Sequence, residues 1–213
     1  LPICKKIGDG TLLSSVWDLR DGKVNLFFYH NYDTTVQFIL KDELKKGNHS
    51  IAIEKLFPPN PEFEQLSYFQ TTKNNNWIAL FILGSATIFL FSSVFFLVQY
   101  FQAKKDPRYT LLKLMLFPIG LVLFYYMYVL SSNVAVFYFP APYQSPTNAL
   151  VSLASYIPLL LLVLILPLLI LNCRIFKEHC WSRFASGLFT INNLIYIGLI
   201  GLFQYWEFFD VFN

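Results

Sequence analysis

Hydrophobic residues are distributed unevenly along this chain of 213 residues. From Trp77 onward, four long stretches are almost wholly apolar, and Lys113 near the start of the second is their only charged residue. A bilayer core needs ~20 apolar residues per helix, and every backbone amide within lipid must be paired internally. We therefore predict four transmembrane helices, locally kinked at Pro118, Pro158 and Pro167. The predicted spans are residues 77–101, 111–131, 149–171 and 184–206.

The front of the chain has a different pattern, in which short β-prone runs are separated by turn signals. Residues 11–19 and 24–30 form two such runs, and the Asp21-Gly22 pair between them is typical of a tight hairpin. A third run over residues 35–40 alternates apolar and polar positions. The pattern predicts a small antiparallel sheet.

The sheet is followed by less regular segments. Residues 41–48 predict a short helical turn with Gly47 as its C-cap, and residues 50–57 a further strand or extended segment. Residues 60–76 are polar and predict a linker. The predicted fold class is thus an α+β membrane protein, with a β-rich module over 1–59, a linker over 60–76 and a four-helix transmembrane domain over 77–213.

Charge supports this division. Residues 1–76 hold nine Lys or Arg and nine Asp or Glu, whereas residues 77–213 hold seven and four. The net charge of +3 is therefore an excess of basic residues beside the membrane spans, and no nucleic-acid partner is expected. The expected partner of the apolar half is the lipid bilayer.

The basic residues of the apolar half also predict its orientation. All seven lie in the loops 102–113 and 172–183, and the loop 131–148 has none. Positively charged loops face the cytoplasm. We therefore predict an integral protein of a plasma or inner membrane, with both basic loops cytoplasmic and with the front module and the carboxyl end outside.

The front module is small for independent folding. Two or three strands with one apolar face are marginal in water, and about 58 residues without a disulfide make a weak core. The chain also begins at Leu1 without an initiator Met or a signal peptide. We therefore expect the sheet to be completed by an upstream chain segment or by a partner protein.

Few residues outside the module suggest chemistry. Cys173, His179 and Cys180 have no second ligand pair, so neither a metal nor a cofactor is expected, and the alternative is a membrane-edge loop. Asn192 and Asn193 are the most polar candidates within the spans. Hydrogen bonding between helices is favoured for them over a transport site.

One stretch of the module resembles a known family. Residues 10–47, with the aromatic run Phe28-Tyr29-His30-Asn31-Tyr32-Asp33, are similar to the carboxyl-terminal strands of linear amide C–N hydrolases. These are the choloylglycine-hydrolase and penicillin V acylase relatives among the N-terminal-nucleophile hydrolases. The resemblance covers about 50 residues and implies an αββα sandwich that hydrolyses an amide bond.

The resemblance also implies a catalytic group that this chain does not supply. The family's nucleophile is a Cys at the start of the processed chain, with its own α-amine as base. Cys4 is not terminal, and His30 stands where many relatives carry an active-site Arg. His30, Tyr32 and Asp33 are thus candidates for the substrate-proximal edge of an amidase pocket, and the alternative is a strand end and a local turn.

Three functions are compatible with these observations. The first is the membrane-anchored carboxyl-terminal portion of an extracytoplasmic amidase whose catalytic Cys lies upstream of or outside this chain. The second is a non-catalytic membrane subunit whose module completes the sheet of a partner. A lipid-binding protein or small transporter is a third possibility, because uncharged spans argue against ion coupling but not against lipid.

Overall fold

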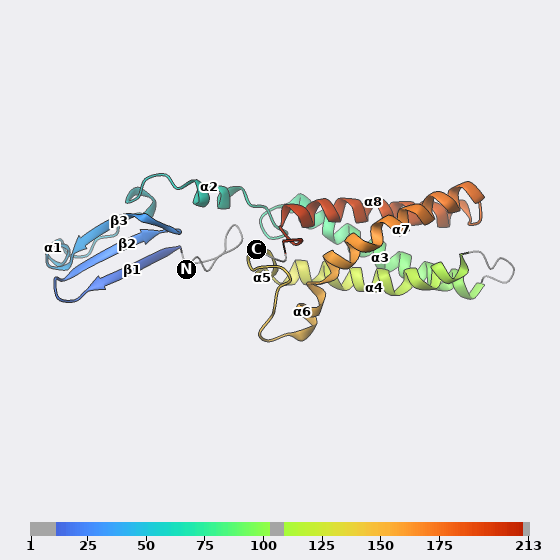
Figure 1. The fold of residues 1–213 in the computed structure, drawn as a ribbon, viewed down its shortest axis with the longest axis horizontal. Coiled ribbons are helices and arrows are strands. Elements are labelled where there is room, and N and C mark those ends of the chain that lie inside the picture. The colour runs from blue at the N-terminus through green and yellow to red at the C-terminus, as the bar shows by residue number, and fades with distance from the viewer. Residues whose placement is uncertain (1–11, 103–108, 211–213) are drawn as a thin grey trace. The chain divides into compact units, whose positions relative to one another are not determined.

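The computed structural model describes residues 12–102 and 109–210, and these divide into two compact units. The first unit extends to Phe69 and contains a sheet with short helices, and the second begins at Gln70 and contains the long helices. Figure 1 shows the elements of each unit. We describe each unit by itself.

The first unit is built on a three-stranded antiparallel sheet of order β1-β2-β3, as the alternating pattern predicted. β1 (Leu13–Asp18) and β2 (Lys23–Phe28) are joined by a four-residue turn in which Gly22 has a φ of +62°. This positive φ favours glycine at that position. β3 (Asn31–Ile39) begins four residues earlier than predicted and follows β2 after only two residues.

The register gives the sheet one apolar and one polar face. Trp17, Val24 and Phe38 form one row across the three strands, and Val24 is buried. On the opposite face, Gln37 donates a hydrogen bond to Asn25 (Nε2 to Oδ1, 3.0 Å). This alternation is typical of an antiparallel sheet with one face toward a core.

The segments after the sheet cover one end of its apolar face. α1 (Leu40–Lys45) follows β3 directly, and the 3-10 helix η1 (Ile53–Lys55) lies where a strand or extended segment was predicted. That prediction of a strand is wrong: the polar pair Glu54-Lys55 interrupts the alternation that a strand would need. α2 (Pro61–Tyr68) lies within the predicted linker, with Pro61 at its first position, where a missing N–H costs nothing.

Among the residues that the structure describes, the second unit contains four spans long and apolar enough to cross a membrane, so this is an integral membrane protein. Three are single helices: α3 (Asn76–Gln102), α4 (Thr110–Ser132) and α8 (Arg183–Tyr205). The remaining span consists of α6 (Ala149–Ala154) and α7 (Ile157–Glu178), separated at Ser155 and Tyr156 just before Pro158. The short helix α5 (Ala135–Tyr138) lies in the connection after α4. The predicted number and order of spans is confirmed.

The basic loops are shorter than predicted. α7 continues to Glu178, so Arg174 and Lys177 lie on a helix and only residues 179–182 connect it to α8. Lys113 likewise lies on α4. Cations near a helix carboxyl end are favoured by the helix dipole, which explains why α7 extends past the apolar run. Lys104, Lys105 and Arg108 lie outside the described residues.

α3 and α4 pack closely because small residues meet between them. A Cβ placed on Gly120 would lie 2.1 Å from Ser93 Oγ and 3.0 Å from the carbonyl oxygen of Phe89. Close approach through small residues is the usual way for helices to associate within a membrane. Gly120 therefore sets the spacing of this helix pair.

The segment before α3 connects the ends of two other helices. Thr72 Oγ1 donates to the carbonyl oxygen of Leu130 (2.8 Å), near the end of α4. The indole Nε1 of Trp206, just after α8, donates to the carbonyl oxygen of Gln70 (2.8 Å). These bonds satisfy polar groups at the helix ends, where intrahelical partners run out.

We predict that Gly120→Ala lowers the stability of the helical unit by about 1–3 kcal/mol, because the new methyl overlaps Ser93 and the α3 backbone. The measurement is the thermal unfolding midpoint of the intact chain in detergent. Gly84→Ala is the matched control: Gly84 is exposed on α3 and a Cβ there meets nothing within 4 Å. Equal midpoints for the two variants would contradict this role of Gly120.

Candidate functional site

The turn between β2 and β3 has an unusual backbone. Phe28 pairs with Asn31, so Tyr29 and His30 form a two-residue hairpin turn, with φ values of +36° and +59°. Such turns normally use Asn and Gly, because positive φ is unfavourable for residues with a large side chain. The turn is therefore strained, and the surrounding contacts must hold it.

Asn60 supplies those contacts. Its Nδ2 donates to the carbonyl oxygens of Tyr29 (2.9 Å) and Phe28 (3.5 Å), and its Oδ1 accepts from the backbone N–H of Phe63 (3.3 Å). The same buried side chain thus caps the start of α2 and binds the turn. A single residue thereby connects the strained turn to the helix that packs beside it.

Aromatic packing reinforces the turn. Tyr29 is buried. The centroid of its ring lies 4.7 Å from that of the His30 ring and 5.6 Å from that of the Phe63 ring, and both pairs are edge-on. Phe28 contacts Phe63 as well, at 4.8 Å, and stacks on Phe57 at 5.4 Å. These edge-on and offset arrangements are the favourable ones for aromatic pairs.

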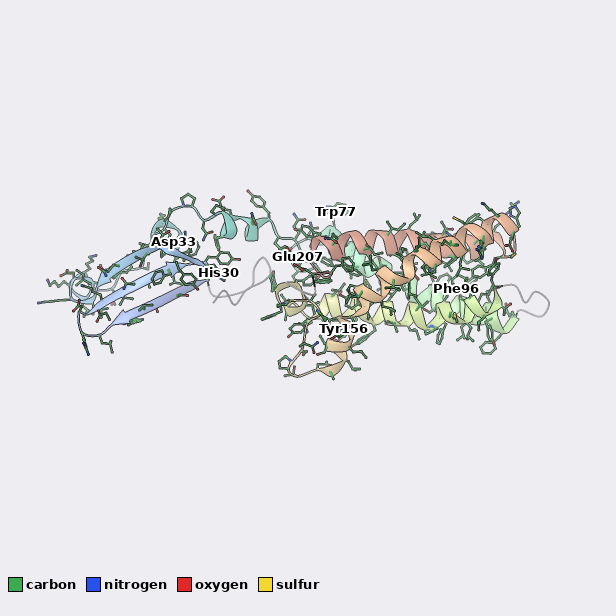
Figure 2. All side chains as sticks on the ribbon, in the orientation of Figure 1. His30, Asp33, Trp77, Phe96, Tyr156 and Glu207 are labelled. Carbon is green, nitrogen blue, oxygen red and sulfur yellow. The ribbon has the colours of Figure 1, made fainter. Side chains whose placement is uncertain are left out.

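The three predicted site residues lie at one end of the sheet but are not all directed to the same face. Figure 2 shows His30 and Asp33 at the β2–β3 end. His30 packs on Tyr29, whereas Tyr32 packs on Phe27 (5.9 Å), which lies on the face opposite to Phe28. Asp33 is exposed. The hairpin turn thus presents one imidazole, with Tyr32 on the polar face.

The local turn that follows is made by Asn31. Asn31 Oδ1 accepts from the backbone N–H groups of Asp33 (3.1 Å) and Thr34 (3.2 Å), and the ladder between β2 and β3 is irregular there. The alternative interpretation of these residues was a strand end and a local turn. The turn-forming bonds are accepted by the Asn31 side-chain oxygen, and Asp33 donates through its backbone N–H.

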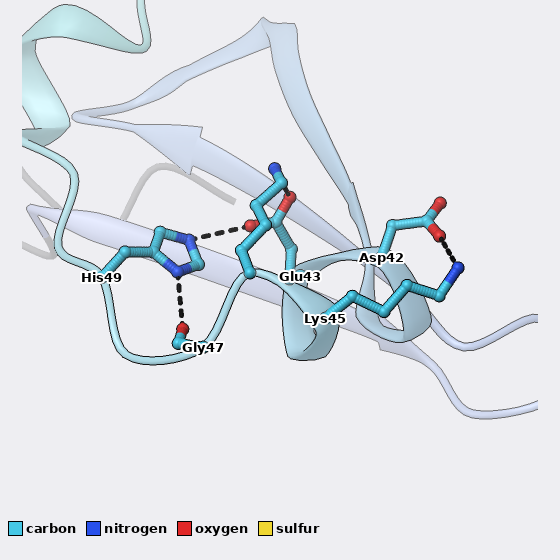
Figure 3. A network of polar contacts seen from close by, with 6 residues as sticks. Asp42, Glu43, Lys45, Gly47 and His49 are labelled. Atoms are coloured by element: carbon cyan, nitrogen blue, oxygen red, sulfur yellow. Dashed lines mark hydrogen bonds and ion pairs between the residues drawn. The ribbon is translucent and has the colours of Figure 1, made fainter.

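A second polar cluster surrounds Glu43 at the end of α1 (Figure 3). Glu43 accepts from Lys46 Nζ (2.6 Å) and contacts His49 Nε2 (2.9 Å), while His49 Nδ1 contacts the carbonyl oxygen of Gly47 (2.9 Å). The bond from Lys46 holds the pKa of the Glu43 carboxyl below its usual value. Since both His49 partners can only accept, the two contacts form together when the imidazole is doubly protonated. This is a solvated surface network that orders the end of α1.

Cys173 and Cys180 do not belong to a cluster of possible metal ligands in the described part of the chain. Among residues 12–102 and 109–210, no three His, Cys, Asp or Glu gather to hold a metal ion. Cys180 Sγ lies 3.4 Å from Glu178 Oε2, and Cys173 is exposed on α7. Cys4 lies outside the described residues.

The asparagines of α8 differ in their partners. Asn192 Oδ1 accepts from Ser92 Oγ of α3 (3.1 Å), so it forms the predicted bond between helices. Asn193 Nδ2 donates instead to the carbonyl oxygen of Phe189 on its own helix (2.9 Å). Thr190 makes a further interhelical bond, to Asn172 of α7 (3.2 Å). Residues of this kind hold membrane helices together.

Chemically, the Tyr29–His30 turn can bind and orient a substrate group, but it lacks a nucleophile of its own. The His30 imidazole can donate or accept a hydrogen bond. Asn60, which sequence reasoning placed in a linker, is the main structural contributor to this site. Its position before Pro61 and three residues before Phe63 is a helix-start signal that could have identified it.

Comparisons of this chain with protein-family models, with curated proteins and with solved structures found no match.

We predict that Asn60→Ala loosens the turn, because it removes the helix cap and leaves the carbonyl oxygens of Phe28 and Tyr29 without their donor. The two losses together cost about 2 kcal/mol. Hydrogen exchange of the intact chain, read on the β2 and β3 amides, should accelerate by about tenfold or more. Asn60→Asp keeps the helix cap but loses the Nδ2 donor, so its exchange rates should fall between those of the wild type and those of Asn60→Ala. Asn48→Ala, in the exposed loop after α1, is the control. Unchanged exchange in Asn60→Ala would contradict the role assigned to Asn60.

Proposed function

We propose that this chain is the membrane-anchored carboxyl-terminal portion of an extracytoplasmic amidase that cleaves linear amide bonds. The observation that carries the proposal is the strained Tyr29–His30 turn. Two non-glycine residues with positive φ are held by a buried Asn at the end of the strands that resemble the hydrolase family. Backbone strain of this kind concentrates at functional sites.

The sheet supports the proposal through its incomplete cover. Trp17 belongs to the apolar row of the sheet and is 57% exposed, although Phe28 at the other end of the same face is buried. Val16, on the opposite face of β1, is also 56% exposed. In the proposed enzyme, further strands or helices of an αββα sandwich cover this end. They come from upstream sequence or from a partner chain.

The proposed reaction uses a Cys thiolate that lies upstream of or outside this chain. The thiolate sulfur attacks the amide carbonyl carbon, the C–N bond breaks, and the amine leaves with a proton from the α-ammonium group. Water then attacks the thioester, which releases the carboxylic acid and regenerates the thiol. His30 binds the substrate near the scissile bond, with Tyr32 and Asp33 at the edge of the pocket.

The test of the amidase begins with the chain isolated from its native membrane by a carboxyl-terminal tag. Intact mass under denaturing conditions, together with 2-cyanobenzothiazole, a reagent selective for amino-terminal Cys, should reveal a longer chain or a companion polypeptide that begins with Cys. The material should release amine from N-acyl amide substrates. We expect His30→Gln to lower kcat/KM about 10- to 100-fold, as for loss of one or two hydrogen bonds to a charged or reacting group.

The matched control is His49→Gln, because His49 lies in the surface network at the end of α1. A preparation that contains neither a Cys-led polypeptide nor amide-hydrolysing activity would overturn the amidase. It would favour the non-catalytic subunit, whose module completes a partner's sheet.

The proposed orientation places the module and the carboxyl end outside and residues 179–182 in the cytoplasm, in line with the basic residues near that connection. With all three native cysteines replaced by Ser, Leu44→Cys supplies a label on the module, where Leu44 is 80% exposed. A membrane-impermeant maleimide should label it in intact cells. A chain that keeps only Cys180 should be labelled only after permeabilisation. The reverse pattern would refute this orientation.

A further inference from the structure

A groove runs between α4 and the α6–α7 pair. It consists of two adjoining cavities that share Val122 of α4 and Ile157 and Leu160 of α7. One cavity extends to Pro118, near the middle of α4, and the other to Tyr156, at the break between α6 and α7. The two cavities adjoin at these shared residues, and we call the pair the α4–α7 groove.

The groove exists because the helices pack in two close pairs. α4 packs along α3 and α7 along α8, whereas α4 and α7 meet only slightly (Figure 1). The mouth is held by polar bonds: the backbone N–H of Ser145 donates to Ser152 Oγ (2.8 Å), and Ser155 Oγ donates to the carbonyl oxygen of Tyr143 (3.1 Å). The groove is therefore built into the fold and does not depend on a single side chain.

The chemistry of the groove changes along its length. The cavity that reaches Pro118 is lined only by Pro, Ile, Val and Leu, whereas the cavity at the α6–α7 break also has Tyr125 and Tyr156 in its lining. Tyr156 Oη accepts from Gln144 Nε2 (3.3 Å). Most of the groove lies on spans that cross the bilayer, where the surrounding medium is hydrocarbon. An occupant must therefore be apolar along its length and can be polar at one end.

The wall residues distinguish a lipid chain from a protein helix. Helices associate within membranes through small residues, as α3 and α4 do at Gly120 and Ser93. The groove instead presents bulky branched side chains, and Val122 and Leu160 are 42% and 51% exposed. A flexible chain can fit between such side chains, whereas a helix could not approach closely.

We propose that the α4–α7 groove binds one acyl chain of a membrane phospholipid, with the ester and headgroup end near Tyr156 and Gln144 and the chain running past Leu160 towards Pro118. This inference rests on the second unit alone and stands whether or not the chain belongs to an amidase.

The test uses the full chain in vesicles that contain a phosphatidylcholine with a photoreactive diazirine midway along one acyl chain. Irradiation inserts the carbene into nearby C–H bonds, and mass spectrometry locates the labelled residues. We expect labelling at Val122 and Leu160 at least fivefold above that at Leu194, which is 62% exposed on α8 and outside the groove. Labelling of equal intensity on the exposed residues of all four spans would overturn the proposal.

Two variants separate the groove from general lipid contact. Leu160→Trp fills the groove and should reduce labelling at Val122 at least fivefold. Val163, elsewhere on α7, is 71% exposed, and Val163→Trp should leave labelling at Val122 unchanged. Circular dichroism confirms that both fold, and the wild-type labelling pattern tests the proposal independently of either. Efficient disulfide formation between copies through Val122→Cys would show that a second copy occupies the groove and would overturn the lipid assignment.

Discussion

The structure of the second unit depends on one constraint: no water is present in the bilayer core to satisfy backbone amides. Every N–H and C=O at that depth must find a partner within the protein, so the apolar spans are helical. The same constraint explains the few polar contacts between them. Ser92 with Asn192, and Thr190 with Asn172, bond to each other across helices because lipid offers no other partner. At the helix ends the segment 70–75 makes polar bonds in both directions: Thr72 donates to the carbonyl oxygen of Leu130, and the carbonyl oxygen of Gln70 accepts from the indole of Trp206.

The first unit depends on the opposite constraint. In water a three-stranded sheet gains little from its own hydrogen bonds and must bury one face. The segments after the sheet cover only part of its apolar face: Phe57 and Phe63 pack on Phe28, whereas Trp17 stays exposed. In this setting a strained turn persists only because a buried Asn and an aromatic cluster compensate for it. The unfavourable φ values of Tyr29 and His30 are thus stabilised by the contacts of a helix more than 30 residues later in the chain.

Sequence periodicity predicted most elements because local patterns determine them. The four spans follow from length and hydropathy, and the sheet from alternation and the Asp21-Gly22 turn. Over 50–57, where a strand or extended segment was expected, a 3-10 helix forms at Ile53–Lys55, because the polar pair Glu54-Lys55 interrupts the alternation that a strand needs. The Tyr29–His30 turn could not be predicted, since neither residue favours positive φ and its stabilisation by Asn60 is a distant contact. The candidate site residues were selected by resemblance, and their arrangement on two faces depends on a register irregularity that composition does not encode.

α4 shows how one helix can have a tight face and a loose one. Toward α3 it presents Gly120, and the backbones approach so closely that no Cβ fits. Toward α7 it presents Val122, where bulky side chains keep the helices apart. Both faces are apolar, so hydropathy alone does not distinguish them; side-chain size does. In hydrocarbon the hydrophobic effect does not drive helices together, and packing quality decides which contacts close. A space left between poorly matched helices is then filled by the solvent of the bilayer, which is why the loose face of α4 is suited to an acyl chain and its tight face to another helix.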